Sequence, residues 1–200
     1  MTRYVVGLTG GIATGKTNIT DALKNAGACV VDADEISRSL TADDGKALPL
    51  IRSAFGNQVF SGESLNRKAL GQLIFSDTEK RKTLNAIMHP LILQETWETV
   101  NQQNGIVFVS APLLYELGME TKCQEVWCTF IPHEEQVKRL MQRDSISAAD
   151  AEKKIASQMP AQEKMRRADL VINTLGTKEE SASAALRAHL RLQAEKLQHQ

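Results

Sequence analysis

The segment Tyr4-Val-Val-Gly-Leu-Thr-Gly-Gly-Ile-Ala-Thr-Gly-Lys-Thr-Asn-Ile-Thr20 sets the architecture of this chain. Its apolar beginning, Tyr4 to Leu8, predicts a buried strand. Gly10 to Thr17 then matches G-x-x-x-x-G-K-[ST] at every fixed position. A helical pattern follows, with one face formed by Ile19, Ala22, Leu23 and Ala26.

This order of strand, glycine-rich loop and helix predicts a phosphate-binding loop. The glycines let the backbone turn tightly and direct its N–H groups inward, and the positive end of the helix dipole points to the same place. Lys16 is expected to reach the β- and γ-phosphates of a nucleotide, and the Thr17 hydroxyl to ligate Mg²⁺. The alternative is a glycine turn that happens to carry a lysine, and the flanking strand and helix argue against it.

The overall composition narrows the class of protein. Two hundred residues with 42% hydrophobic content suit one domain with small insertions. With 24 basic and 24 acidic residues the net charge is zero, so we expect no nucleic-acid partner and no membrane partner. The three cysteines show no C-x-x-C spacing and are expected to be reduced thiols. The chain enters a strand at once, which leaves no room for a signal peptide, so we expect a cytoplasmic protein.

Two acidic residues follow the second predicted strand, Ala28 to Val31, in the sequence Asp32-Ala-Asp34. In an open α/β sheet, ligands collect at the carboxyl ends of the strands. One of these acids is therefore expected to accept the proton of an attacking hydroxyl, and the other to hold Mg²⁺ or its waters. For Asp32 the alternative is a cap on the following helix.

Residues 45–103 are expected to form a helical insert. Such a length exceeds the dozen or so residues that a βαβ crossover needs, so it predicts a subdomain that supplies an acceptor pocket; packing decoration is the alternative. Arg52, Arg67 and His89 are polar residues that could face a ligand there, although His89 is equally well a structural histidine. No histidine stands at metal-ligand spacing, so no zinc site is predicted. Helices are expected over 47–55, 65–75, 76–88 and 91–102, with turns over 55–62 and a break at His89-Pro90.

A third strand, Ile106 to Ser110, ends in serine where many phosphate-loop enzymes have an aspartate for Mg²⁺. Because this aspartate is missing, we expect Asp32, Asp34 and Thr17 to bind the metal ion instead. Shortly afterwards comes Glu116, which fits either a helix start or a ligand site.

The later part of the chain predicts a lid. After a strand over 125–131, helices are expected over 133–143, 147–158 and from 160 onward, then a strand over 169–172 and a closing helix over 178–200. The arginine-rich hairpin resembles the lid of a nucleotide kinase, whose guanidinium groups neutralise the transferred phosphoryl. Most of its basic residues are expected to form a solvated face; Arg143 and then Arg139 are expected to reach the phosphates.

Several motifs, taken together and in order, resemble the dephospho-CoA kinase family over residues 5–176. They are Gly7 to Ile12 with Gly15-Lys-Thr, Val31-Asp-Ala-Asp34 with Arg38, Leu65-Asn-Arg67, Leu70-Gly71, Phe75-Ser-Asp77, Leu84-Asn-x-Ile87-x-His89-Pro90, Pro112-Leu-Leu-Tyr-Glu116, Gln142-Arg143-Asp144, Ser157-Gln-Met-Pro160 and Ala168 to Ile172. The resemblance implies ATP-dependent phosphorylation of the ribose 3′-hydroxyl of dephospho-CoA, the last step of coenzyme A synthesis. The chain departs from the family pattern at Ala13, usually glycine, at Asn18, and at Asn173-Thr174, usually Asp-Asn.

The expected fold is therefore α/β, a P-loop NTPase-type parallel five-stranded sheet flanked by helices, in a single kinase domain that is a monomer or a weak homo-oligomer. The core is expected over 1–44, 104–137 and 168–200, with the acceptor-binding insert at about 45–103 and the lid at about 138–167.

The expected mechanism is in-line phosphoryl transfer from ATP with Mg²⁺. Asp34 is the preferred base and Asp32 the metal-side partner with Thr17, although these two acids could exchange roles; Lys16 and Arg143 complete the catalytic set. The nucleotide is expected to contact Gly11, Ile12, Ala13, Thr14, Gly15, Lys16, Thr17, Asn18 and Arg139, and the acceptor to contact Asp34, Arg38, Arg67, His89, Leu114 and Glu116. The rival functions are a shikimate-kinase-like enzyme and a regulatory NTP-binding switch, against which the missing N-K-x-D motif argues.

Overall fold

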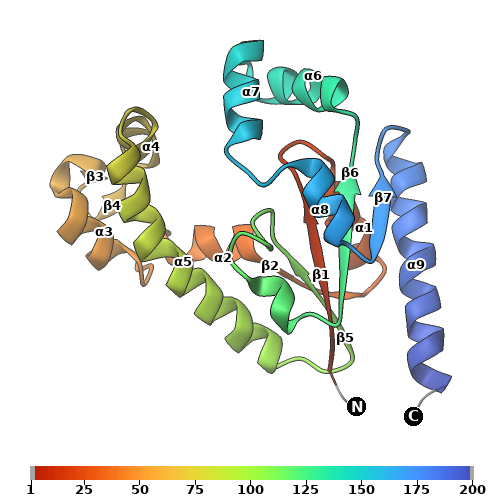
Figure 1. The fold of residues 1–200 in the computed structure, drawn as a ribbon. Helices are drawn as coiled ribbons and strands as arrows, with labels where there is room; N and C mark the ends of the chain where they lie inside the picture. The colour runs from red at the N-terminus through yellow and green to blue at the C-terminus, as the bar shows by residue number, and fades with distance from the viewer. Residues whose placement is uncertain (1–2, 199–200) are drawn as a thin grey trace. The chain divides into compact units, whose positions relative to one another are not determined.

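The computed structural model describes residues 3–198, which form two compact units (Figure 1). One unit contains the chain up to Val31 and from Val100 onward, and the other contains Asp32–Thr99. The elements of the first unit are β1 (Tyr4–Gly10), α1 (Lys16–Asn25), β2 (Cys29–Asp32, whose last residue begins the second unit), β5 (Ile106–Ser110), η2 (Met119–Lys122), β6 (Glu125–Phe130), α6 (His133–Asp144), α7 (Ala148–Ala156), α8 (Ala161–Arg167), β7 (Leu170–Asn173) and α9 (Lys178–Gln198).

A five-stranded sheet in the order β2-β5-β1-β6-β7 forms the centre of the first unit. β1 is parallel to β5 and to β6, and β6 is parallel to β7. The expected α/β fold with a parallel five-stranded sheet is confirmed. Because β1 lies in the middle, the loop that follows it leaves the sheet from its central strand.

One face of this sheet carries the main apolar core. Alternate strand residues point to it, among them Val6 and Leu8 of β1, Phe108 of β5 and Trp127 of β6. The rings of Phe108 and Trp127 pack edge to face, 5.1 Å apart between centroids. Helices α1 and α9 pack against each other over this face; Figure 1 shows α9 alongside β7. Burial of large side chains such as these stabilises the fold by about 1.5–3 kcal/mol each.

The second unit contains α2 (Ala33–Leu40), α3 (Leu48–Phe55), η1 (Asn57–Val59), β3 (Phe60–Ser61), β4 (Ser64–Leu65), α4 (Arg67–Ser76) and most of α5 (Thr78–Asn101). Its own apolar core is formed by Leu40, Ala47, Ile51, Phe55, Val59, Leu70 and Met88. The short antiparallel hairpin β3–β4 was not predicted: β3 lies in the segment expected to form turns, and β4 includes Leu65, which was expected to begin a helix. The second unit begins at Asp32, so it contains α2 in addition to the helices that were expected in the insert.

The predicted helix break at His89-Pro90 is wrong, because α5 continues through Pro90 from Thr78 to Asn101. A proline inside a helix removes one N–H donor and costs about 3 kcal/mol. Apolar residues on both sides of it, including Leu84, Ile87, Met88 and Leu91, pack on the core of the second unit and offset that cost. Over residues 3–198, no helix combines the length and the apolar character needed to span a bilayer.

Candidate active site

The loop between β1 and α1 has the backbone conformation of a phosphate cradle. Gly15 adopts φ +83°, a left-handed conformation, and forms the N-cap of α1. Because Gly15 has no side chain, the N-cap residue makes no side-chain hydrogen bond to the first N–H groups of this helix, which suits them to an anion. Ala13 also adopts a positive φ of 61°, where the family usually has glycine. An uncapped helix N-terminus after a glycine-rich turn is a ready anion-binding site.

Lys16, the first residue of α1, is largely buried. Its ammonium donates to the hydroxyl of Ser110, at the carboxyl end of β5, across 2.6 Å. Ser110 occupies the strand end at which many phosphate-loop enzymes have an aspartate. The structure therefore links the lysine of the loop to the end of the neighbouring strand.

Three threonines support the loop: Thr14, expected above to contact the nucleotide, Thr174, noted above as a departure from the family pattern, and Thr129, which the sequence did not single out. Thr14 Oγ1 donates to the carbonyl of Gly11 and lies 2.7 Å from Thr129 Oγ1. Thr174 Oγ1 donates to the carbonyl of Thr14, also across 2.7 Å. A side chain at Gly10 would collide with Thr129, which explains the glycine there. Two glutamines, Gln136 and Gln158, also contact the loop; only Gln158 fell within a motif quoted above.

The expected nucleotide contacts Arg139 and Asn18 both have protein partners. Arg139 Nη2 donates to the carbonyl of Thr174 across 2.8 Å, which places its guanidinium group beside a residue that supports the loop. The Asn18 amide donates to the carbonyl of Lys178 and to Ser181, and so joins α1 to α9. A contact of either side chain with nucleotide stays a prediction.

Arg143 lies at the end of α6 and is paired with its neighbour in sequence. Its Nε donates to Asp144 Oδ1 across 2.8 Å, and Lys154 of α7 donates to Asp144 Oδ2 across 2.7 Å. These two hydrogen bonds lower the pKa of the Asp144 carboxyl to about 2. Asp144 therefore holds α6 and α7 together and orients the exposed guanidinium group of Arg143.

Lys164 is an exception to the solvated face expected for most basic lid residues, because its side chain is 0% exposed. Its ammonium lies 2.9 Å from Glu116 Oε1 and donates to the carbonyl of Pro112. The same Glu116 oxygen accepts the N–H of Met159 across 2.8 Å. Glu116 thus joins the segment after β5 to α8, and its contact with an acceptor stays a prediction. Leu114 is fully buried, and its contact with the acceptor stays a prediction.

In the second unit, Asp32 caps α2. Its Oδ1 accepts the N–H of Asp34 across 2.8 Å and the N–H of Glu35 across 3.2 Å, so the capping alternative holds for this residue. Asp34 occupies the first turn of the same helix and is exposed. The structure thus distinguishes the two acids: the orientation of Asp32 is fixed by the helix N-terminus.

The basic residues predicted for acceptor binding have different surroundings within the second unit. Arg67 Nη2 donates to the carbonyls of Arg38 and Thr41 at the end of α2. Arg52 donates to Asn57 and to Glu63 and so holds the β3–β4 hairpin, while the Arg38 side chain is exposed. Burial lowers the pKa of His89, which favours its neutral form.

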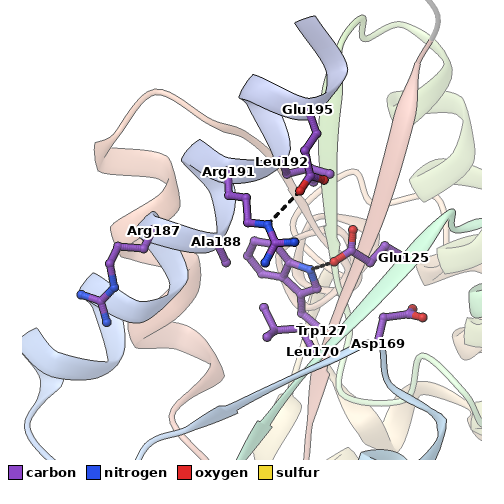
Figure 2. Close-up of a pocket in the computed structure, with 9 residues that line it drawn as sticks. All are labelled: Glu125, Trp127, Asp169, Leu170, Arg187, Ala188, Arg191, Leu192 and Glu195. Carbon is purple, nitrogen blue, oxygen red and sulfur yellow. Dashed lines mark hydrogen bonds and ion pairs between the residues drawn. The ribbon is translucent and has the colours of Figure 1, made fainter. Parts of the chain in front are cut away.

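A separate cavity of about 430 Å³ lies between α9 and the amino ends of β6 and β7 (Figure 2). Figure 2 shows Trp127 at its centre, with Glu125 accepting from the indole N–H and Glu195 paired with Arg191. The phosphate loop follows the carboxyl end of β1, which is parallel to β6, so this cavity is at the other end of the sheet. It is not part of the loop site.

A parallel sheet whose central strand leads into a glycine-rich loop, an uncapped helix and a buried lysine defines the class: a P-loop phosphotransferase. Comparisons with known proteins narrow it. The family model for dephospho-CoA kinase matches residues 4–180. A dephospho-CoA kinase of Geobacter sulfurreducens is 40% identical over 182 residues, 88% of this chain and 92% of that protein. The chain belongs to the dephospho-CoA kinase family, and the expected family is confirmed.

Solved structures agree with this assignment. A Thermus thermophilus protein has a TM-score of 0.80 at 32% identity, covering 96% of this chain and 98% of that one. A dephospho-CoA kinase from Campylobacter jejuni has a TM-score of 0.72 at 26% identity, covering 98% of this chain and all of that one.

Proposed function

We propose that this protein transfers the γ-phosphoryl group of ATP to the ribose 3′-hydroxyl of dephospho-CoA, giving coenzyme A and ADP. The observation that carries the proposal is the phosphate cradle, with its uncapped helix and Lys16, in a chain of this family. Such a transfer has a loose transition state, so the protein acts mainly by positioning groups and neutralising charge. We also place the enzyme in the cytosol, where its three cysteines, which are free thiols, would stay reduced.

In this proposal, the N–H groups of the loop and the Lys16 ammonium bind the phosphates of ATP. Arg143 and Arg139 neutralise charge on the transferred group, and the orientation of Arg143 by Asp144 supports its part. Arg38, Arg67, His89 and Glu116 are proposed to serve the acceptor.

The residues present fit a Mg²⁺ ion that is shared with the nucleotide. Thr17, the second residue of α1, is exposed, and the described residues contain no group of three His, Cys, Asp or Glu side chains that could hold a metal ion. Mg²⁺ commonly takes one or two protein ligands and otherwise phosphate oxygens and waters. Thr17 and Asp32 would hold it, and when bound it would neutralise charge on the β- and γ-phosphates.

Asp34 is proposed as the base that receives the proton of the 3′-hydroxyl. Asp32 is oriented by two backbone N–H groups, which suits a fixed carboxylate beside the metal. Asp34 lies two residues further along the chain, in the first turn of α2, and its carboxylate does not cap this helix. The capping geometry supports this proposed assignment of the two acids.

The test is ADP release from ATP with dephospho-CoA, with shikimate, and with no acceptor. The proposal expects strong stimulation by dephospho-CoA alone. Stimulation by shikimate instead would favour the first rival, and slow acceptor-independent hydrolysis would favour a nucleotide switch. Asp34→Asn is expected to reduce kcat by about a hundredfold or more and to leave ATP affinity nearly unchanged; equal losses of both would contradict the base role.

A further inference from the structure

The backbone of Ile12, inside the phosphate-binding loop, is held on both sides by glutamine side chains. Its N–H donates to Oε1 of Gln158 across 2.8 Å, and its carbonyl accepts from Nε2 of Gln136, also across 2.8 Å. Gln136 belongs to α6 and Gln158 follows α7, so both come from residues more than a hundred positions away. Both hydrogen bonds lie within the first unit.

The contact with Gln136 is closely packed. Gln136 is only 3% exposed, and a Cβ added at Gly11 would lie 2.8 Å from Gln136 Nε2. A side chain at position 11 would therefore displace the amide of Gln136 from this position. The hydrogen bond to Ile12 satisfies a buried amide, which a protein interior otherwise disfavours.

The residue after Ile12 is strained. Ala13 has a φ of 61°, in the left-handed region that an L-residue with a Cβ avoids. Such a conformation persists only where the surrounding structure enforces it. Since the peptide bond is planar, a hydrogen bond that fixes the Ile12 carbonyl also fixes the N–H of Ala13, which points to the opposite side.

We infer that Gln136 and Gln158 are positioning residues for nucleotide binding: they fix Ile12 and thereby keep Ala13 in the strained conformation that presents its N–H to a phosphate oxygen. This inference rests on the proposed binding of ATP phosphates at this loop. The two glutamines act through Ile12 and are assigned no contact with the nucleotide.

The main test is ADP affinity, measured by titration calorimetry on the full chain with Mg²⁺ present. Gln158→Ala and Gln136→Ala are each expected to weaken ADP binding about threefold to tenfold, the range of one neutral hydrogen bond. Glycine populates positive φ readily, so a chain that also carries Ala13→Gly no longer needs the glutamines to enforce it. In that background each glutamine change is expected to cost less than about twofold. Gln162→Ala, on an exposed position of α8, is the matched control and should change nothing.

A second measurement follows the Ile12 amide by hydrogen exchange without nucleotide. Gln158→Glu keeps an acceptor for this N–H and should keep its protection, whereas Gln158→Ala should lose it. At position 136 the order differs, because Gln136→Glu removes the donor and should weaken ADP binding at least as much as Gln136→Ala. If the two glutamines contributed only to general stability, Gln158→Glu and Gln136→Glu would not differ in this way.

Equal losses of ADP affinity with and without Ala13→Gly would overturn the inference, as would full ADP affinity in Gln158→Ala despite an unprotected Ile12 amide. If Gln136→Ala does not fold, the Gln158 variants still decide. Neither measurement uses an acceptor. Failure of the unaltered protein to phosphorylate dephospho-CoA while it binds ADP would therefore refute the proposed function and leave this inference to its own test.

Discussion

The ammonium of Lys16 donates to the hydroxyl of Ser110 across 2.6 Å, at the point where β5 ends beside the phosphate loop. Ser110 is fully buried and also lies 3.3 Å from Thr20 Oγ1. A buried ammonium needs hydrogen-bond acceptors, and a serine hydroxyl supplies one without adding the negative charge that would repel a nucleotide. Lys16 is thus already directed toward the edge of the sheet at which ligands of α/β proteins collect.

Ser110→Ala should therefore destabilise the protein without nucleotide by about 1–2 kcal/mol, because it removes an acceptor from a buried charge. With saturating ADP the loss should be smaller, since phosphate oxygens then accept from Lys16. Thermal unfolding with and without ADP measures both values. Thr20→Val, which removes the other hydroxyl beside Ser110 and leaves the acceptor of Lys16 in place, is the control. Equal destabilisation in both conditions would show that Ser110 does not act through Lys16.

The two roles of Asp32 can be separated by substitution. Asparagine caps helices as well as aspartate does, so Asp32→Asn should keep the cap on α2 and the stability of the chain. It should still lower kcat at least tenfold, because the carboxylate proposed beside Mg²⁺ is gone. Asp32→Ala should lose the same activity and about 1 kcal/mol of stability as well. Urea unfolding and ADP-release assays over a range of Mg²⁺ concentrations make the comparison; full activity in Asp32→Asn would restrict this residue to capping.

Lys164→Met tests the buried ion pair. Removing this buried ammonium takes one donor from Glu116, which keeps the N–H of Met159, and takes the donor from the Pro112 carbonyl, so a loss of about 3 kcal/mol is expected. The same change at Lys153, whose exposed pair with Asp150 spans 3.7 Å, should cost less than about 0.5 kcal/mol. Urea denaturation of the two variants gives the comparison. Similar small losses at both positions would mean that the Glu116–Lys164 contact contributes little.

Asp144 predicts a dependence of stability on pH. Its pKa in the folded protein, about 2, lies below the ordinary value of 3.8, so the folded state favours the ionised form. The contribution of the carboxylate is therefore complete above about pH 4 and is lost as the pH falls toward 2. Asp144→Asn should be less stable than the unaltered protein at pH 6, and the difference should shrink steadily on acidification. Denaturant unfolding at several pH values checks this; a constant difference would show that the Arg143 and Lys154 contacts are not linked to ionisation.

The strands and most helices could be predicted from the sequence because their signals are local. The hydrophobic runs gave β5 at its observed bounds, and Ser147 with Asp150 marked the start of α7 as a capping pair. The continuous helix through Pro90 could not be predicted in this way. Its stability depends on packing against residues such as Ile51 and Phe55, which lie on a different helix.

The residues of the candidate site also differ in whether the sequence alone could predict them. Spacing alone predicts a phosphate-binding loop from the glycines, Lys16 and Thr17, since the chemistry needs those residue types close together in the sequence. The groups that shape this loop, Gln136, Gln158 and Thr174, come from more than a hundred residues away, and no local pattern indicates that they contact it.

The sequence by itself determined that this chain binds a nucleotide phosphate and belongs among kinases, because a short run of residues carries that information. Only the tertiary structure decided how the loop is held, that Lys164 is buried against Glu116 and that Asp32 is a helix cap. The physical reason is that hydrogen bonds and ion pairs form between neighbours in space, and the folded sheet makes neighbours of residues that the sequence keeps far apart.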